Sequence, residues 1–159
     1  MCRRVLRVIK KYDDLELIYS EALLNKIGHL AMQHHPNEFG GFLIGKYSED
    51  LKKLYVEDFI LPKKYKGHRY TFERSTNGLK EHLEKLFLEK NQYYIGEWHT
   101  HPDSSIDYSK TDLMAMSQIA QYGEVTILNP ILLILSISKS ELNEYKFYLY
   151  KDKKLLGYD

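Results

Sequence analysis

The chain has 159 residues, of which 43% are hydrophobic and 28% charged, and its formal net charge is +1. This length and composition suit one compact globular domain, which we expect to span residues 1–159. A net charge near zero argues against a general nucleic-acid-binding protein, which needs a one-sided basic excess. The longest apolar run, Pro130 to Ile137, is too short to cross a bilayer, so we expect no membrane segment.

The cysteine count and the N-terminal residues indicate where in the cell the protein is expected. Cys2 is the one cysteine in the sequence, so no disulfide can form within the chain. The first residues carry positive charge but lack the apolar segment of a secretory signal peptide. These features predict a cytoplasmic protein in a reducing environment.

The first elements in chain order are a strand and a helix. Arg4 to Lys10 predicts the strand, and Ser20 is a suitable N-cap for a helix that continues to about His34. Pro36 then prevents further helix. The apolar residues at helical spacing are Leu23, Ile27, Leu30 and Ala31.

A predicted hairpin follows this helix. Phe39 to Gly45 is typical of a buried strand, and Lys52 to Leu61 predicts its partner, with the turn at Tyr47 to Asp50. Lys63 to Gly67 predicts a basic loop, and the alternating residues His68 to Arg74 predict a short strand.

The second half of the chain continues to alternate helices and strands. We expect a helix over Thr76 to Lys90, a strand over Tyr93 to His101 and a helix from Ser109 to about Tyr122. The remaining predicted strands are Ile131 to Ile137, Glu144 to Tyr150 and Lys154 to Leu156. This alternation predicts an α+β (α/β layered) architecture.

Two histidines in the strand that ends at His101 are candidate metal ligands. Side chains at positions i and i+2 of a strand lie on one face, so His99 and His101 can converge on one point. Pro102 disfavours helical angles at His101 and keeps the pair extended. Trp98 and Thr100 then face the other way, with Trp98 in the core. Because strand histidines are common as polar surface or core residues, the pair alone does not identify a site.

A serine and an aspartate begin the next predicted helix. One interpretation is a capping box, in which Ser109 caps the helix and Asp112 reaches back to the cap amide. The functional interpretation uses the same geometry, because a helix start beside a strand end aims Asp112 at the two histidines. Two imidazoles and one carboxylate suit Zn²⁺ and leave a fourth position for water, as in catalytic zinc sites.

A zinc site that activates water also needs a general base. Glu38 lies in a loop just before the buried strand, where a solvated surface role is the simpler alternative. Gly40 and Gly41 favour the functional role, because glycine permits close backbone approach. Glu97 is a rival base or a hydrogen-bond partner of a ligand histidine, since it precedes His99 by two residues on the same face.

Five of these residues together resemble the JAMM motif, also called MPN+ or JAB. The matching positions are Glu38, His99, His101, Ser109 and Asp112, with seven residues from Pro102 to Tyr108. EFGGFLIG resembles the glutamate-bearing strand of the family, and the order of elements is similar across nearly the whole chain. The resemblance implies an MPN/JAB-like (cytidine-deaminase-like) fold, a curved mixed sheet flanked by helices.

The same resemblance implies a zinc isopeptidase like the deubiquitinating enzymes, with one Zn²⁺ per chain. Its ligands would be His99, His101 and Asp112. Glu38 would be the general base, and the Ser109 hydroxyl would stabilise the oxyanion. The residues that bind substrate are not implied by the motif.

A narrower resemblance connects YYIGEWHTHPD and HRYTFERS with short bacterial JAB peptidases of anti-phage CBASS operons. There, a ubiquitin-transfer-like enzyme conjugates the C-terminus of a nucleotidyltransferase to target proteins, and the peptidase removes it. This implies a protein substrate joined through its C-terminus, either ubiquitin-like or a CD-NTase-type nucleotidyltransferase. Residues Lys63 to Arg74 could grip such a partner, although a solvated loop and edge strand explain most of them.

Three alternatives remain open. The same chemistry could process a sulfur-carrier or ubiquitin-like precursor. The fold could serve as a catalytically inactive scaffold. A different His-x-His metalloenzyme, such as an amidohydrolase, is a further option, although the chain is short for a barrel of about 250 residues.

Overall fold

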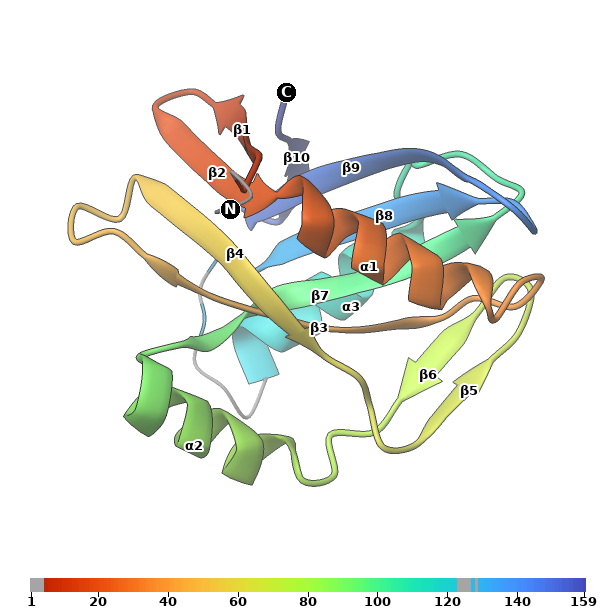
Figure 1. The fold of residues 1–159 in the computed structure, drawn as a ribbon, viewed down its shortest axis with the longest axis horizontal. Coiled ribbons are helices and arrows are strands. Elements are labelled where there is room, and N and C mark those ends of the chain that lie inside the picture. Colours follow the sequence, from red (N-terminus) through yellow and green to blue (C-terminus); the bar gives the residue numbers. More distant parts are fainter. Residues whose placement is uncertain (1–4, 123–126, 128) are drawn as a thin grey trace.

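The computed structural model describes residues 5–122, 127 and 129–159. Its main-sheet strands are β1 (Arg7–Tyr12), β2 (Leu15–Ser20), β3 (Gly40–Tyr47), β4 (Lys53–Ile60), β7 (Tyr93–Pro102), β8 (Ile131–Ile137), β9 (Leu142–Lys151) and β10 (Lys154–Gly157). They form one sheet in the order β1-β2-β4-β3-β7-β8-β9-β10 (Figure 1). The pairs β2–β4 and β7–β8 are parallel and the other neighbours antiparallel. This mixed sheet with helices confirms the predicted α+β class.

Helices cover both faces of the sheet. Helix α1 (Glu21–Met32) crosses one face, and α3 (Lys110–Tyr122) lies behind the sheet in Figure 1. Helix α2 (Leu79–Lys90) packs on the same side as α3, since its buried leucines share a hydrophobic cluster with Ile119. None of the described helices has both the length and the apolar character needed to span a bilayer.

The sheet curves until its two edges meet. Lys11 in β1 and Asp159, just after β10, exchange backbone hydrogen bonds with N···O distances of 2.8 and 2.9 Å. Beside them, the rings of Tyr12 and Tyr158 contact edge to face, with 6.5 Å between centroids. The curved mixed sheet that the family resemblance implied is therefore present.

A separate two-stranded ribbon stands beside the main sheet. It consists of β5 (Tyr65–Gly67) and β6 (Phe72–Arg74), which pair antiparallel. The prediction of a loop over Lys63 to Gly67 was therefore wrong for β5. The strand predicted over His68 to Arg74 is shorter, because the His68 amide donates to the Thr71 carbonyl at 2.9 Å and closes a turn.

The other differences lie at element ends. The predicted first strand begins outside the described residues, and β1 continues to Tyr12. Strand β2, which the sequence analysis missed, ends at Ser20. Ser20 caps α1 as predicted, its Oγ accepting from the Leu23 amide at 3.0 Å. Helix α1 ends at Met32 instead of His34. Helix α2 begins only after Gly78, whose φ of 74° is left-handed.

Candidate metal centre

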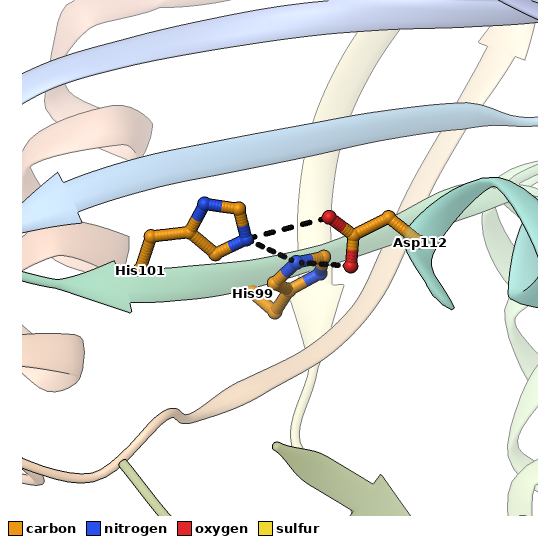
Figure 2. A group of neighbouring side chains, drawn as sticks. All are labelled: His99, His101 and Asp112. Atoms are coloured by element: carbon orange, nitrogen blue, oxygen red, sulfur yellow. Dashed lines mark hydrogen bonds and ion pairs between the residues drawn. The ribbon is translucent and has the colours of Figure 1, made fainter. Parts of the chain in front are cut away.

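The three side chains predicted as metal ligands converge in the structure. Figure 2 shows the imidazoles of His99 and His101, from β7, pointing toward the carboxylate of Asp112 in the first turn of α3. The two Nε2 atoms are 3.1 Å apart. Nε2 of His99 is 3.1 Å from Oδ1 of Asp112, and Nε2 of His101 is 3.4 Å from Oδ2. One ligand atom from each residue lies within 4.8 Å of the others, which is the spacing of a candidate metal site.

The alternation of β7 explains how its histidines come to share a face. On the opposite face, Trp98 is 1% exposed and Thr100 is fully buried. Trp98 belongs to the core cluster against α1, as predicted. Strand β7 pairs with β3 on one side and β8 on the other, so the backbone of His99 is held from both sides.

Gly40 allows β3 to approach β7 at this point. A Cβ atom on Gly40 would lie 2.2 Å from the Trp98 carbonyl oxygen and 2.9 Å from the Cβ of His99. Similarly, a Cβ on Gly41 would lie 2.6 Å from the Ile60 carbonyl oxygen. All three distances are shorter than real Cβ contacts, which confirms the predicted close backbone approach.

Ser109 and Asp112 form the predicted capping box. The Ser109 amide donates to Oδ2 of Asp112 at 2.7 Å, and the Asp112 amide donates to Oγ of Ser109 at 3.1 Å. The capping role and the ligand role are therefore compatible, because one carboxylate faces both the helix start and the histidines. Oγ of Ser109 uses a lone pair for this bond, so its own proton can still be donated to another group.

The surroundings of the three side chains suit a cation. Burial by itself would raise the pKa of Asp112, but hydrogen bonds from His101 and His99 outweigh it and hold that pKa well below its usual range. Burial alone would lower the pKa of His101, yet its bonds to Asp112 and the Ser105 carbonyl raise it overall. The site thus holds an ionised carboxylate that favours positive charge beside it.

One hydrogen bond also orients a ligand histidine. Nδ1 of His101 lies 2.8 Å from the Ser105 carbonyl oxygen. A carbonyl can only accept, so Nδ1 carries a proton, and Nε2 is the ring nitrogen that faces Asp112 and would be available to an ion. Such a bond to the outer ring nitrogen is typical of metal-bound histidines. Two nitrogens and one carboxylate oxygen are a donor set that fits Zn²⁺.

The two candidate bases have different environments. Glu38 is half-buried and lines the same cleft as the two histidines. Burial raises the pKa of Glu38, and the charges of His99 and His101 offset this only in part. Glu97 lies on the ligand face as predicted, but it is ion-paired with Arg74 of β6. Glu97 is therefore engaged with a cation in the ribbon.

A cleft of about 1040 Å³ opens over the three side chains. One wall comes from β7 and α3, and the other from ribbon residues 69–74. Of the basic residues in the segment Lys63 to Arg74, the two arginines line the cleft. Lys63, Lys64 and Lys66 are not among its lining residues.

The pair His35–Asp103, next to the cleft residue Arg69, was not predicted from the sequence. His35 lies three residues after the end of α1. Its Nε2 lies 2.8 Å from Oδ2 of Asp103, a residue with φ of 54° that directly follows β7. Arg69 approaches the same carboxylate at 3.9 Å. No sequence signal connects positions so far apart in the chain.

Comparisons with known proteins identify the family of the chain. A family model described as prokaryotic homologues of the JAB domain matches residues 20–148. A CD-NTase/cGAS isopeptidase from Enterobacter hormaechei subsp. hoffmannii is 33% identical over 120 residues, which is 75% of this chain. The match covers 66% of that relative, so this chain spans slightly less than two thirds of its length.

Two solved structures share the fold. One is a protein from Desulfitobacterium hafniense, with a TM-score of 0.64, 18% identity and 87% of each chain covered. The other is a protein from Salinibacter ruber, with a TM-score of 0.54 and 17% identity, covering 89% of this chain and 86% of that one.

Proposed function

The chain belongs to the family of prokaryotic JAB-domain homologues, and from that premise we propose that it is a zinc-dependent isopeptidase. The observation that carries the proposal is the convergence of His99, His101 and Asp112 at the floor of a cleft that Glu38 also lines. We further propose that residues 1–159 act as a single catalytic domain in the cytoplasm.

The three converging side chains would hold one Zn²⁺ ion. When bound, the ion supplies Lewis acidity and lowers the pKa of a water molecule toward neutrality. His99 and His101 would hold it through the converging Nε2 atoms, and Asp112 would hold it through its carboxylate. Because Ser109 donates its backbone amide to Asp112, the orientation of the carboxylate is set before the ion arrives.

Glu38 is proposed to move the protons of the reaction. Its carboxylate takes the proton from the attacking water, and its carboxyl returns that proton to the leaving amine. The raised pKa of Glu38, caused by burial, makes the carboxylate a stronger base and so favours the first transfer, from water to Glu38. Its place beside the ligand face is where a base for this water is needed.

Ser109 is proposed to stabilise the charge that develops on the carbonyl oxygen. Its Oγ already accepts the Asp112 amide, which fixes the position of the hydroxyl. The hydroxyl proton is then available for a hydrogen bond to the oxyanion.

The substrate is proposed to be a protein joined to its target through its C-terminal tail. Strand β6 pairs with β5 along one edge, and residues of β6 line the cleft. An extended tail can pair with a sheet edge through its backbone, while alternate side chains enter pockets. The relative named CD-NTase/cGAS isopeptidase supports a CD-NTase-type nucleotidyltransferase as the tail-bearing partner. A ubiquitin-like partner and a role in antiviral defence rest on the family resemblance of the sequence.

The test uses two substrates with the same tail. One carries a protein attached through an isopeptide bond to lysine, and the other carries a linear C-terminal extension. We expect the isopeptide substrate to be cleaved faster, with activity lost in chelator and restored by Zn²⁺. Glu38→Gln protein treated in the same way is the matched control.

The other outcomes of this assay would favour one of the alternative functions. Faster cleavage of the linear substrate would favour the alternative of precursor processing by the same site. If neither substrate, nor conjugates in a cell lysate, were cleaved by the zinc-loaded protein, the isopeptidase proposal would be rejected in favour of an inactive scaffold.

A further inference from the structure

We propose that Thr100 and Gly67 are positioning residues that hold the backbone of Glu38 from two sides. This inference rests on the proposed function, because Glu38 is the base of that reaction. It adds two residues that the motif does not assign a role. The two contacts come from different parts of the fold, one from the ligand strand and the other from the ribbon.

We call these two contacts on the Glu38 backbone the clamp. Its first side is Thr100, which lies between the two proposed histidine ligands on β7. Its Oγ1 accepts the amide of Phe39 at 3.0 Å, and its own amide donates to the Phe39 carbonyl at 2.9 Å. Phe39 directly follows Glu38. The segment that carries the base is thus bonded twice to the residue between the ligands.

Burial makes the side-chain bond significant. Thr100 is fully buried, and Phe39 is 2% exposed. A buried hydroxyl or amide that lacks a partner costs about 1–3 kcal/mol. Valine has nearly the same shape as threonine and would pack equally well, so packing alone does not require a hydroxyl here.

The second side of the clamp is the ribbon. The Glu38 amide donates to the His68 carbonyl at 2.8 Å. Just before His68, a Cβ atom on Gly67 would lie 2.3 Å from the carbonyl oxygen of Glu38. The ribbon therefore touches the backbone of the base itself, and only a residue without a side chain allows this contact.

The ribbon is also anchored to the residue after the base. The ring of Phe39 contacts Tyr65 of β5 at 5.0 Å and Phe72 of β6 at 6.0 Å between centroids. Glu38 consequently has a fixed position relative to both walls of the cleft. A base shifted by about 1 Å can cost on the order of 10² in rate, so this fixation matters for turnover.

The experiment compares Thr100→Val with Thr100→Ser. Thr100→Val should lower kcat about 10- to 100-fold with KM nearly unchanged, because it removes the bond to the Phe39 amide while leaving the substrate wall intact. Thr100→Ser keeps the hydroxyl and should retain most of the activity. Bound zinc, measured by elemental analysis, should stay at the wild-type level in both.

The control for Thr100→Val is Tyr93→Phe. Tyr93 also lies on β7, and its hydroxyl accepts a backbone amide of β3, that of Tyr47, at 2.6 Å. Tyr93→Phe thus removes the same kind of bond, from a backbone amide to a side chain of β7, at the end of β7 away from the metal centre. It should leave kcat and KM unchanged.

Gly67→Ala tests the ribbon side independently. Its added methyl group meets backbone that cannot move without moving Glu38, so kcat should fall while zinc stays bound. Gly157→Ala is the matched control. There a Cβ would lie 2.4 Å from Cε of Lys146, which is the end of a flexible side chain.

Amide hydrogen exchange separates this inference from the proposed function. Faster exchange across residues 38–40 in Thr100→Val and Gly67→Ala, but not in Tyr93→Phe, would support the clamp even if the wild type cleaved no conjugate. Unchanged exchange together with unchanged kcat would overturn it. If Thr100→Val failed to fold, Gly67→Ala and Thr100→Ser would decide the matter by the same measurements.

Discussion

The two walls of the cleft are built in different ways. The β7–α3 wall carries the candidate ligands on a strand paired along both edges, and the side chains of His99 and His101 are 13% and 12% exposed. The other wall is the β5–β6 ribbon, whose strands have three residues each and whose Tyr70 is 75% exposed.

This difference separates metal binding from substrate binding. The ligand geometry follows from the hydrophobic core, because β7 cannot shift without moving Trp98 and its neighbours. The ribbon is anchored by a few contacts, among them the ion pair of Arg74 with Glu97. Changes in the first wall should therefore affect zinc occupancy and kcat. Changes to the ribbon side chains that line the cleft should affect mainly KM, whereas Gly67, which contacts the Glu38 backbone, should affect kcat.

The largest effect is expected from removing a ligand on the core wall. His101→Ala leaves one imidazole and one carboxylate, too few to retain the ion, so both zinc and activity should be lost. Elemental analysis and a cleavage assay measure the two losses. Full zinc occupancy in this variant would contradict the ligand set, and His82→Ala, a helix residue outside the cleft lining, is the control.

The next effect concerns the proposed base. Glu38→Gln should keep zinc but lower kcat by about 10²–10⁴, the usual contribution of a general base. In the wild type, kcat should fall as the pH decreases through the pKa of Glu38, because the protonated carboxyl cannot accept a proton. That pKa is raised by burial, so the fall should begin at a higher pH than for an exposed glutamate. Wild-type turnover by the purified variant would exclude Glu38 as the base.

A smaller effect is expected from the oxyanion donor. Ser109→Ala should lower kcat by about 10²–10³, as the loss of one such donor does elsewhere. It also removes a helix cap, which alone costs about 1 kcal/mol of stability. Ser20→Ala removes the cap of α1 and controls for this. Equal kcat losses in both variants would mean that Ser109 acts only as a cap.

The ribbon wall should respond through KM. Arg74→Ala leaves Glu97 without its partner and loosens β6, so we expect KM to rise about tenfold, equivalent to about 1.4 kcal/mol, with zinc retained. The double variant Arg74→Met with Glu97→Gln removes both charges and should recover part of the affinity. A change confined to kcat would show that this ion pair acts on the reaction, through Glu97 or through the position of Glu38, and not on substrate binding.

The smallest effect is expected from the basic residues outside the cleft. Changing Lys63, Lys64 and Lys66 to glutamate should leave KM unchanged, because these residues do not line the cleft. Arg69→Glu, a change at the cleft rim, is the positive comparison. A large increase in KM for the triple variant would show that the substrate also contacts residues outside the cleft. Substrate binding would then not be confined to the cleft wall formed by the ribbon.

The features that the sequence predicted are local ones. Alternation in a strand placed His99 and His101 on one face, and the spacing of Ser109 and Asp112 predicted the capping box. Both signals depend on residues within one turn or a few positions of strand, so the sequence contains them in full.

The features that the sequence did not predict depend mostly on contacts between distant segments of the chain. The pairs His35–Asp103 and Arg74–Glu97 join residues 68 and 23 positions apart. Polar residues at the end of a helix or strand look the same whether they face solvent or a partner. Strand β2 is an exception, because it forms a tight hairpin with β1 through the turn at Asp13 and Asp14, which is a local contact.

The joined edges of the main sheet have a consequence for self-association. Open sheet edges recruit strands from other copies, which leads to domain swapping and fibre growth. Here the backbone groups of Lys11 and Asp159 are already hydrogen-bonded to each other. A strand from another copy would have to break these bonds before it could pair at this edge. The joined edges of the main sheet are thus protected from strand exchange. Strand β6, which does not belong to that sheet, has an edge that is not paired with it beside the cleft.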